Sequence, residues 1–407
     1  MNDRFEIPAR LRNTSLAFIA VGILTLIGGI ACLLMGQHTT DVDRARFWAV
    51  LLHDSVFFTV ITAVSVFIQA AVTLAQGSWI VAYRRVPEAI GANVWVFGSI
   101  FFVVALLIVF TFRDAHGVNT IYKWVTPGND KILLGKKVFL NPAVYFGFSL
   151  FAIGAWSLIG RKFRAFSIAQ ESAPKNDTKI YWKVFRLSSI FILIYALTQM
   201  SVTPWLWIMS VQAHWYSTMF SWYNWASAFV SGMSLILLWV VYLKNQGNLQ
   251  LVTTEHMHDL GKFMFAFSIF WTYVWFAQYM LQWYANIPDE TQYFKMRQQG
   301  PYSVIFYANF IINFCMPILI IMSRPSKRNY FTLTFMAMIL IFGHWLDFYQ
   351  MIMPGPLGAN WHINWYEIGI FMGFVGILIF TVSRTLTQSS LVPNNNLLLK
   401  ETVVHLS

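Results

Sequence analysis

The sequence predicts an all-α integral membrane protein with ten transmembrane helices. Of its 407 residues, 57% are hydrophobic and 11% are charged, and the mean hydropathy is +0.56. This balance is typical of a membrane protein rather than a soluble globule. Ten apolar runs are long enough to cross a hydrocarbon core of about 30 Å at about 1.5 Å per helical residue. Such unbroken runs also exclude the alternating strands of a membrane barrel.

The ten runs follow one another with short connections and leave no room for a soluble domain. They lie near 15–36, 51–75, 91–112, 142–160, 184–203, 221–243, 262–284, 303–323, 330–350 and 366–385.

A weak internal repeat groups these helices. The third and seventh each follow a segment with an acid near the helix start, Arg85–Gly91 and Glu255–Gly261, and Pro142 and Pro301 precede the fourth and eighth. We therefore expect two four-helix bundles in parallel orientation, formed by helices 2–5 (51–203) and helices 6–9 (221–350). Helix 1 (15–36) and helix 10 (366–385) would flank them.

The distribution of basic residues predicts the orientation. Of 28 Lys and Arg residues, 19 lie at the two termini and in the loops after helices 2, 4, 6 and 8. The positive-inside bias then places both termini in the cytoplasm, in a bacterial inner membrane. The net charge of +11 is explained by this bias and by contact with anionic lipid, and nothing indicates nucleic acid.

The chain has few residues that could hold a redox cofactor. Cys32 and Cys315, the only cysteines, each fall in an apolar run. This excludes an iron–sulfur cluster, a cysteine zinc site and attached c-type haem within the chain. No histidine lies in the middle of a predicted helix, so we expect no b-type haem and no metal. If the chain does redox chemistry, its electrons would have to leave through a partner.

The seventh helix carries a polar seam along one face. Phe267, Trp271, Trp275, Gln278 and Gln282 recur at helical spacing, so they share roughly one side. Because amides facing lipid are costly, this side should point into a bundle. A turn with two acids, Asp289 and Glu290, follows the helix.

Histidines and carboxylates gather at the exoplasmic helix ends. The candidate groups are His53/Asp54, Arg113/Asp114/His116, Asp289/Glu290 and His344/Asp347. A histidine beside a carboxylate can relay protons near neutral pH. The alternative is that they are exposed interfacial residues or simple ion pairs.

Amides supply most of the polarity of the predicted interior. They are Gln69, Gln199, Gln278, Gln282, Asn309 and Asn313. They could form interhelical hydrogen bonds, each worth about 0.6–2 kcal/mol, or line a hydrated path for protons. A cytoplasmic entrance to such a path could consist of Glu88, Glu255, His256, His258 and Asp259.

The segment from Glu255 to Thr291, together with Gly77–Trp79 and Arg84–Glu88, resembles the membrane subunits of bacterial alternative complex III. These subunits belong to the polysulfide reductase (NrfD/PsrC-like) superfamily. The complex is a quinol:electron-acceptor oxidoreductase with two homologous membrane subunits, and the length of this chain is closer to that of the shorter one.

The resemblance implies partners and a substrate. The chain would pack beside its larger homologue and against periplasmic iron–sulfur and c-type haem subunits, which would pass electrons to a cytochrome or oxidase. Quinol would bind near the periplasmic face of the first bundle, and His53, Asp54, Asp114 and His116 are the positions that could match, with Arg113 beside them.

Three functional hypotheses remain open from the sequence. The chain could bind quinol, or conduct protons through Gln278, Gln282, His344 and Asp347, or both. It could instead be a purely structural subunit of the complex. A stand-alone secondary transporter is disfavoured because no interrupted helix or central charge marks a substrate site.

Overall fold

The computed structural model describes residues 4–35, 40–174, 177–360 and 362–404 and consists of helices and loops. Across those ranges, ten helical spans are long and apolar enough to cross a membrane, so the chain is a multi-pass membrane protein. The predicted all-α fold class is confirmed. No strand occurs in the described part, which has a single isolated bridge between Arg4 and Ser390.

The spans are built from the following elements: α1 Ala9–Met35, α2 Asp41–Leu74, α3 Arg85–Gly91 with α4 Val94–Phe110, α6 Pro142–Glu171, α7 Lys179–Ser201 with η3 Val202–Ile208, α8 Met219–Asn245, α9 Thr254–Ala285, α11 Ser303–Phe310 with η5 Ile311–Cys315 and α12 Met316–Ile321, α14 Tyr330–Ile352, and α16 Trp365–Leu386. The connections hold η1 Val81–Tyr83, η2 Lys123–Val125, α5 Lys131–Gly135, η4 Met209–Gln212, α10 Pro288–Gln298, α13 Arg324–Arg328, α15 Pro354–Leu357 and α17 Leu399–Val403.

Several helices extend beyond the apolar runs because polar residues cap them. A capping box between Thr40 and Asp43 starts α2 at Asp41, ten residues before the predicted start at residue 51. His53 is therefore the thirteenth residue of the helix rather than near its beginning. His344 is the fifteenth of the 23 residues of α14. The expectation that no histidine lies well inside a helix was wrong for both.

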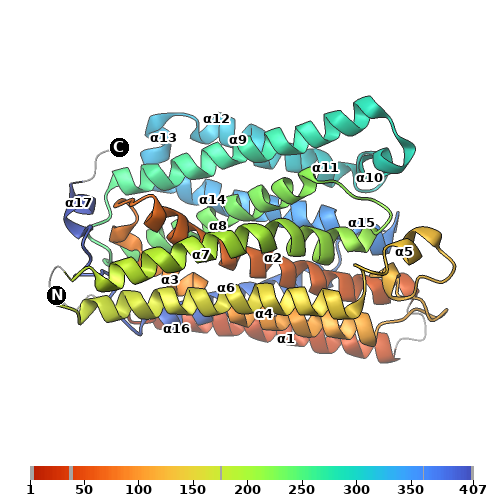
Figure 1. Cartoon of the computed structure of the whole chain (residues 1–407), viewed down its shortest axis with the longest axis horizontal. Helices are drawn as coiled ribbons and strands as arrows, with labels where there is room; N and C mark the ends of the chain where they lie inside the picture. The colour runs from red at the N-terminus through yellow and green to blue at the C-terminus, as the bar shows by residue number, and fades with distance from the viewer. Residues whose placement is uncertain (1–3, 36–39, 175–176, 361, 405–407) are drawn as a thin grey trace.

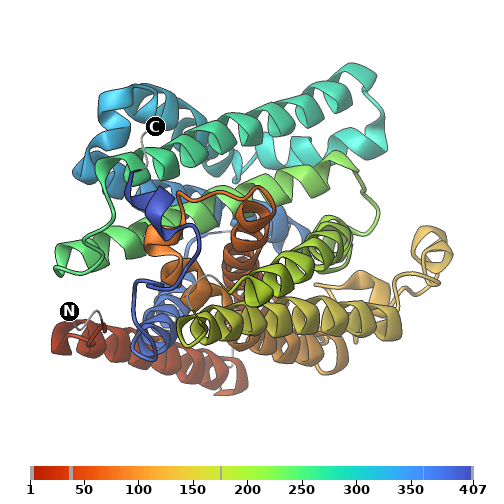
Figure 2. The same cartoon turned by 60° about the vertical axis from the view of Figure 1, so that its left-hand side comes forward.

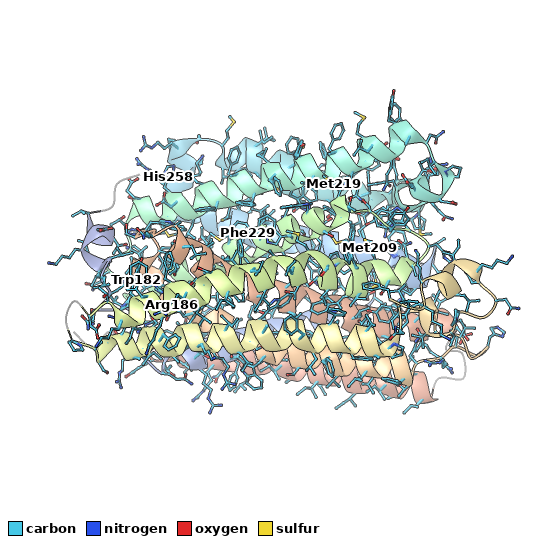
Figure 3. The ribbon with its side chains drawn as sticks, in the orientation of Figure 1. Trp182, Arg186, Met209, Met219, Phe229 and His258 are labelled. Carbon is cyan, nitrogen blue, oxygen red and sulfur yellow. The ribbon has the colours of Figure 1, made fainter. Side chains whose placement is uncertain are left out.

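The helices run side by side and define two ends, which we name the terminal face and the far face (Figure 1). The terminal face carries the start of α1, the start of α9 and α17. The far face carries α5, α10 and α15. His258 lies at the terminal face, Phe229 about midway along the molecule, and Met209 and Met219 toward the far face (Figure 3).

The spans pack as two adjoining groups (Figure 2). In the first, α2, α4, α6 and α7 contact one another around a ring, and in the second α8 contacts α9 and α14, while α11 and α12 pack on α14. The helices α2 and α8 touch where the groups meet, and 89% of the apolar window of each is buried. The helix α16 packs on α2 and α3, and α1 packs mainly on α16.

Small residues bring α1 and α16 together. An ideal Cβ on Gly373 would lie 2.8 Å from Gly22 Cα, and one on Gly376 would lie 2.7 Å from the backbone nitrogen of Ile19. Glycine at Gly369, Gly373 and Gly376 recurs along one side of α16, as in the small-residue interfaces of membrane helices. The outward side of α1 remains apolar and exposed, including Leu24 and Leu34.

Candidate functional site

The helix α14 places His344 and Asp347 in the centre of the second group, with both side chains fully buried. The Asp347 carboxylate accepts hydrogen bonds from the Tyr223 hydroxyl of α8 and from the Trp271 indole of α9, 2.9 Å away. His344 Nδ1 lies 3.0 Å from the Ser227 hydroxyl and 3.8 Å from Asp347 Oδ2. The predicted pair is thus one site, built by three helices.

The partners of Asp347 suit an ionised carboxylate. An ionised carboxylate only accepts hydrogen bonds, and the indole N–H can only donate. Hydrogen bonds to charged groups contribute about 1.5–3 kcal/mol each, and an unpaired buried charge would be strongly unfavourable. Tyr223 and Trp271 therefore make burial of this acid tolerable.

Several buried polar atoms beside the pair have no protein partner. In the described part these include His344 Nε2, both side-chain polar atoms of Asn313, Asn309 Oδ1 and Gln350 Nε2. The Asn309 amide donates to Gln350 Oε1 at 3.0 Å. Because buried polar atoms are normally hydrogen-bonded, unpaired ones in a cluster indicate ordered water.

A π-helical turn and a glycine allow Asn313 to reach this cluster. The π-helix η5 interrupts the span between α11 and α12, and such turns often occur at functional sites. An ideal Cβ on Gly343 would lie 2.2 Å from Asn313 Oδ1. The missing side chain at Gly343 therefore leaves the space that the amide occupies beside His344.

The polar seam of α9 faces the bundle, as predicted. Trp271, Gln278 and Gln282 are buried, whereas Phe267 and Trp275 are partly buried. Gln278 Nε2 and Gln282 Oε1 have no partner among the described atoms. Gln282 also lines a cavity of about 280 Å³ between α9 and α10, together with Asn286, Thr291 and Gln298. The seam thus reaches from Asp347 to the far face.

Between His344 and the terminal face, the side of α14 that carries His344 is apolar. Toward the terminal face, Leu340, Ala337, Met336 and Leu333 precede His344 by 4, 7, 8 and 11 residues and are fully buried. They extend over about 16 Å at 1.5 Å per residue. Opposite them, α8 offers only hydroxyls: Ser231 donates to the Ser227 carbonyl, and Ser234 Oγ has no described partner.

The terminal-face candidates Glu255, His256, His258 and Asp259 all lie in the first two turns of α9, where Figure 3 labels His258. Glu255 forms an ion pair with Arg328 at 2.7 Å, and Asp259 forms one with Lys262 at 2.6 Å. His256 is buried, with Nε2 3.1 Å from the Thr402 hydroxyl of α17, and His258 is also buried. The apolar residues of α14 separate this group from His344. Glu88 is bound elsewhere, to Arg84 and Arg85.

His53 and Asp54 form a second buried pair, which packs against α14. The Trp345 indole donates to Asp54 Oδ1 at 2.7 Å, and His53 Nε2 lies 3.0 Å from the Trp345 carbonyl. Since a carbonyl only accepts, Nε2 carries a hydrogen. His53 Nδ1 is 3.4 Å from Asp54 Oδ1.

The remaining candidates lie in exposed turns. Asp114 accepts from the backbone N–H groups of His116 and Val118, and Arg113 donates to the Val109 and Phe112 carbonyls. Ala115 contacts Asp41, which precedes His53 by 12 residues or about 18 Å along the helix. The structure therefore does not bring Asp114 and His116 to His53.

Asp289 and Glu290 occupy the first turn of α10, where acids favour the helix dipole. The helix α9 ends before them, because Asn286 adopts a left-handed conformation with φ 48° and Pro288 starts a new helix. Asp289 is exposed. These acids are not part of the buried site around Asp347.

Sequence reasoning missed two fully buried arginines near the far face. Arg46 donates to the backbone carbonyls of His362 and Asn360 at 2.7 and 2.6 Å. Arg297 of α10 also binds backbone carbonyls, that of Gln350 on α14 at 2.8 Å and that of Tyr293 at 2.9 Å. One feature of the sequence could have indicated them: both are basic residues on the predicted exoplasmic side, where the positive-inside rule leaves few basic residues.

No family model and no curated protein matches the chain. In the described ranges, no three His, Cys, Asp or Glu side chains gather in a way that could hold a metal ion.

Proposed function

We propose that this chain is a proton-conducting membrane subunit of a quinol-oxidising respiratory complex, with His344 and Asp347 as its protonatable site. The observation that carries the proposal is the fully buried pair in which His344 Nε2 has no hydrogen-bond partner among the described atoms, while the unpaired Asn313 amide packs against the adjacent Gly343. A buried titratable pair beside water-binding groups is an arrangement suited to relaying protons.

The geometry suggests how a proton would move. His344 Nε2 accepts it from water held near Asn313, and Nδ1 releases a proton toward Asp347 Oδ2 or the Ser227 hydroxyl. The ring thereby changes tautomer without moving. Gln350, Asn309, Gln278 and Gln282 then offer amide groups toward the far face. The 16 Å apolar stretch of α14 keeps the site closed to the terminal face, so transfer to that side requires a change in this stretch.

The membership in a complex rests on the resemblance to alternative complex III. In that setting the far face is periplasmic, in a bacterial inner membrane, and both termini are cytoplasmic. The partners are a larger homologous membrane subunit and periplasmic iron–sulfur and c-type haem subunits.

The test is proton translocation by the purified complex in liposomes. Asp347→Asn keeps the shape and can still pair with Tyr223 and Trp271, but it cannot hold a negative charge. We expect it to abolish proton release while quinol oxidation continues without coupling. Asp289→Asn, the same change at an exposed acid, is the matched control and should translocate normally. Unchanged proton release in Asp347→Asn would refute the proposal.

Quinol binding at His53 and Asp54 is the second candidate function. His53 Nδ1 and Asp54 Oδ2 lack hydrogen bonds in the described structure, and an apolar cleft of about 370 Å³ between α1, α2, α4 and α16 includes Leu51, one turn away. A quinol hydroxyl could give its proton to the pair. Asp54→Asn should then raise the KM for quinol, whereas Asp114→Asn should not. An unchanged KM in Asp54→Asn would remove this candidate.

A further inference from the structure

We propose that a cavity at the far face binds an anionic phospholipid, with an acyl chain between the apolar walls of the cavity and the headgroup phosphate at Lys136. We name it the α5 cavity, because one of its walls begins at Gly135, the last residue of α5. This lipid site is separate from the proton path through His344 and Asp347, and neither depends on the other.

The α5 cavity lies at the far-face end of the fifth span. Its volume is about 390 Å³, within the range of pockets that hold small organic ligands. One wall comes from η3 and η4, where Trp205 and Met209 line the cavity (Figure 3). The other wall comes from the segment after α5, where Val138 and Phe139 line it. An acyl chain that enters from the bilayer would therefore contact apolar side chains on both sides.

The rim of the α5 cavity is apolar and uncovered. Val138 is 89% exposed and Tyr216 is 67% exposed, and Phe139 and Trp205 are exposed as well. Tryptophan and tyrosine are typical of the level at which the hydrocarbon core meets the headgroups. The cavity therefore opens at the depth where a phospholipid changes from acyl chain to headgroup.

A cation lies at this opening and is bound by neutral groups. Lys136 lines the cavity, and its ammonium donates to the Ala213 carbonyl at 2.5 Å and lies 5.6 Å from the centre of the Tyr216 ring. None of the ion pairs of the described residues includes Lys136. Burial lowers the pKa of Lys136, so its charged form is stabilised less here than in water. An anion at the rim would offset this loss.

The sequence around Lys136 makes this part of the far face positive. The segment Lys131–Leu140 carries three lysines and no acidic residue. The acid that precedes it, Asp130, is already bound by His214 at 2.6 Å. An apolar segment with several basic residues is typical of contact with anionic lipid.

The two features together select the class of ligand. A neutral lipid or quinol would use the apolar walls but leave Lys136 without an anion, and a free phosphate would bind Lys136 but leave the walls uncovered. An anionic phospholipid matches both.

The test is native mass spectrometry of the detergent-purified full-length protein, titrated with phosphatidylglycerol or with phosphatidylcholine of the same acyl chains. The wild type should bind one phosphatidylglycerol more tightly than phosphatidylcholine. Lys136→Gln should weaken phosphatidylglycerol binding about fivefold, the effect of one basic residue near a membrane surface, and leave phosphatidylcholine unchanged. Lys136→Arg keeps the charge and should bind like the wild type.

The matched control is Lys131→Gln, which removes the same charge from an exposed position of α5 outside the lining of the cavity. It should bind phosphatidylglycerol like the wild type. Equal losses in Lys131→Gln and Lys136→Gln would indicate diffuse attraction to the surface and overturn the proposal. Equal binding of the two lipids by the wild type would assign the cavity to a neutral ligand and overturn it too.

A second variant tests the acyl chain and leaves Lys136 in place, so it applies even if Lys136→Gln does not fold. Gly135 lines the cavity, and a Cβ there would meet nothing within 4 Å, so Gly135→Leu narrows the space without a clash. It should weaken the binding of both lipids. Gly147→Leu on α6, where a Cβ also meets nothing within 4 Å, is the control and should bind normally. Wild-type binding by Gly135→Leu would refute the placement of the chain.

Discussion

Replacing Gly343 by alanine tests the contact that brings Asn313 to His344. The new methyl group would lie 2.2 Å from Asn313 Oδ1 and 2.4 Å from Ile312 Cγ2, both well inside van der Waals contact. Either α14 must move away from η5 or the amide must turn from its position. Overpacking of this kind costs about 1–3 kcal/mol.

A matched substitution separates the effect of this contact on stability from the effect of helix propensity. Gly154 lies in the middle of α6, and a Cβ there would meet nothing within 4 Å. Glycine to alanine inside a helix gains about 0.5–1 kcal/mol at either position. Gly154→Ala should therefore be slightly stabilising, and Gly343→Ala should be less stable than Gly154→Ala by about the 1–3 kcal/mol of overpacking.

The assay is thermal or denaturant unfolding of the detergent-solubilised protein, with both variants measured beside the wild type. If Gly343→Ala is as stable as Gly154→Ala, α14 and η5 are not in the close contact described, and Asn313 is not held beside His344. If stability falls as expected, the same variant should also slow proton release.

Three further predictions concern other parts of the chain. Trp345→Phe removes the indole that donates to Asp54. The loss of a hydrogen bond to a charged group should lower the free energy of unfolding by about 1.5–3 kcal/mol. Trp95→Phe, at a half-exposed position, should change the free energy of unfolding little in the same unfolding experiment. Hydrogen bonds from the Leu133 backbone N–H and then from His214 hold the pKa of Asp130 below its ordinary value of 3.8. Ionised Asp130 therefore stabilises α5 at pH values above 3.8. This stabilisation is lost as the pH falls through the lower pKa of the folded state. The protection factors of the Ile132 and Leu133 amides against hydrogen exchange should therefore fall on acidification, and Asp130→Asn should abolish that pH dependence. Asn395 donates to the Gln170 and Ala173 carbonyls. Asn395→Ala removes these two hydrogen bonds of about 0.5–1.5 kcal/mol each and should speed tryptic cleavage at Lys400 about tenfold. The control is Asn394→Ala, at an exposed position, and equal cleavage of the two variants would contradict the docking of the C-terminal segment.

The spans were predictable because hydrophobic length alone decides which segments can cross a bilayer. Their ends were not, because polar caps determine them. The capping box at Thr40 moves the start of α2 outward by about three turns and puts His53 deep inside the protein. Hydropathy cannot register such an extension, since the added turns are polar and amphipathic.

The candidate site was predictable in part. The spacing of His344 and Asp347 placed them on one side of one helix, and the helical spacing of Trp271, Gln278 and Gln282 gave the inward side of α9. The donors to Asp347 were not predictable, because Tyr223 and Trp271 come from helices that precede it by 124 and 76 positions. Arg297 was not predictable either, since a basic residue in a loop is normally solvated.

By itself the sequence determined that this is an all-α membrane protein with ten spans, and which side of α9 and α14 is polar. These properties are local, set by composition and by the 3.6-residue period. The tertiary structure alone decided which polar groups meet. It joined His344 and Asp347 to Tyr223 and Trp271, left Asp114 and His116 in an exposed turn, and buried Arg297 of α10 against the Gln350 carbonyl of α14. The physical reason is that burial and long-range pairing depend on how helices pack, and electrostatic coupling depends on both.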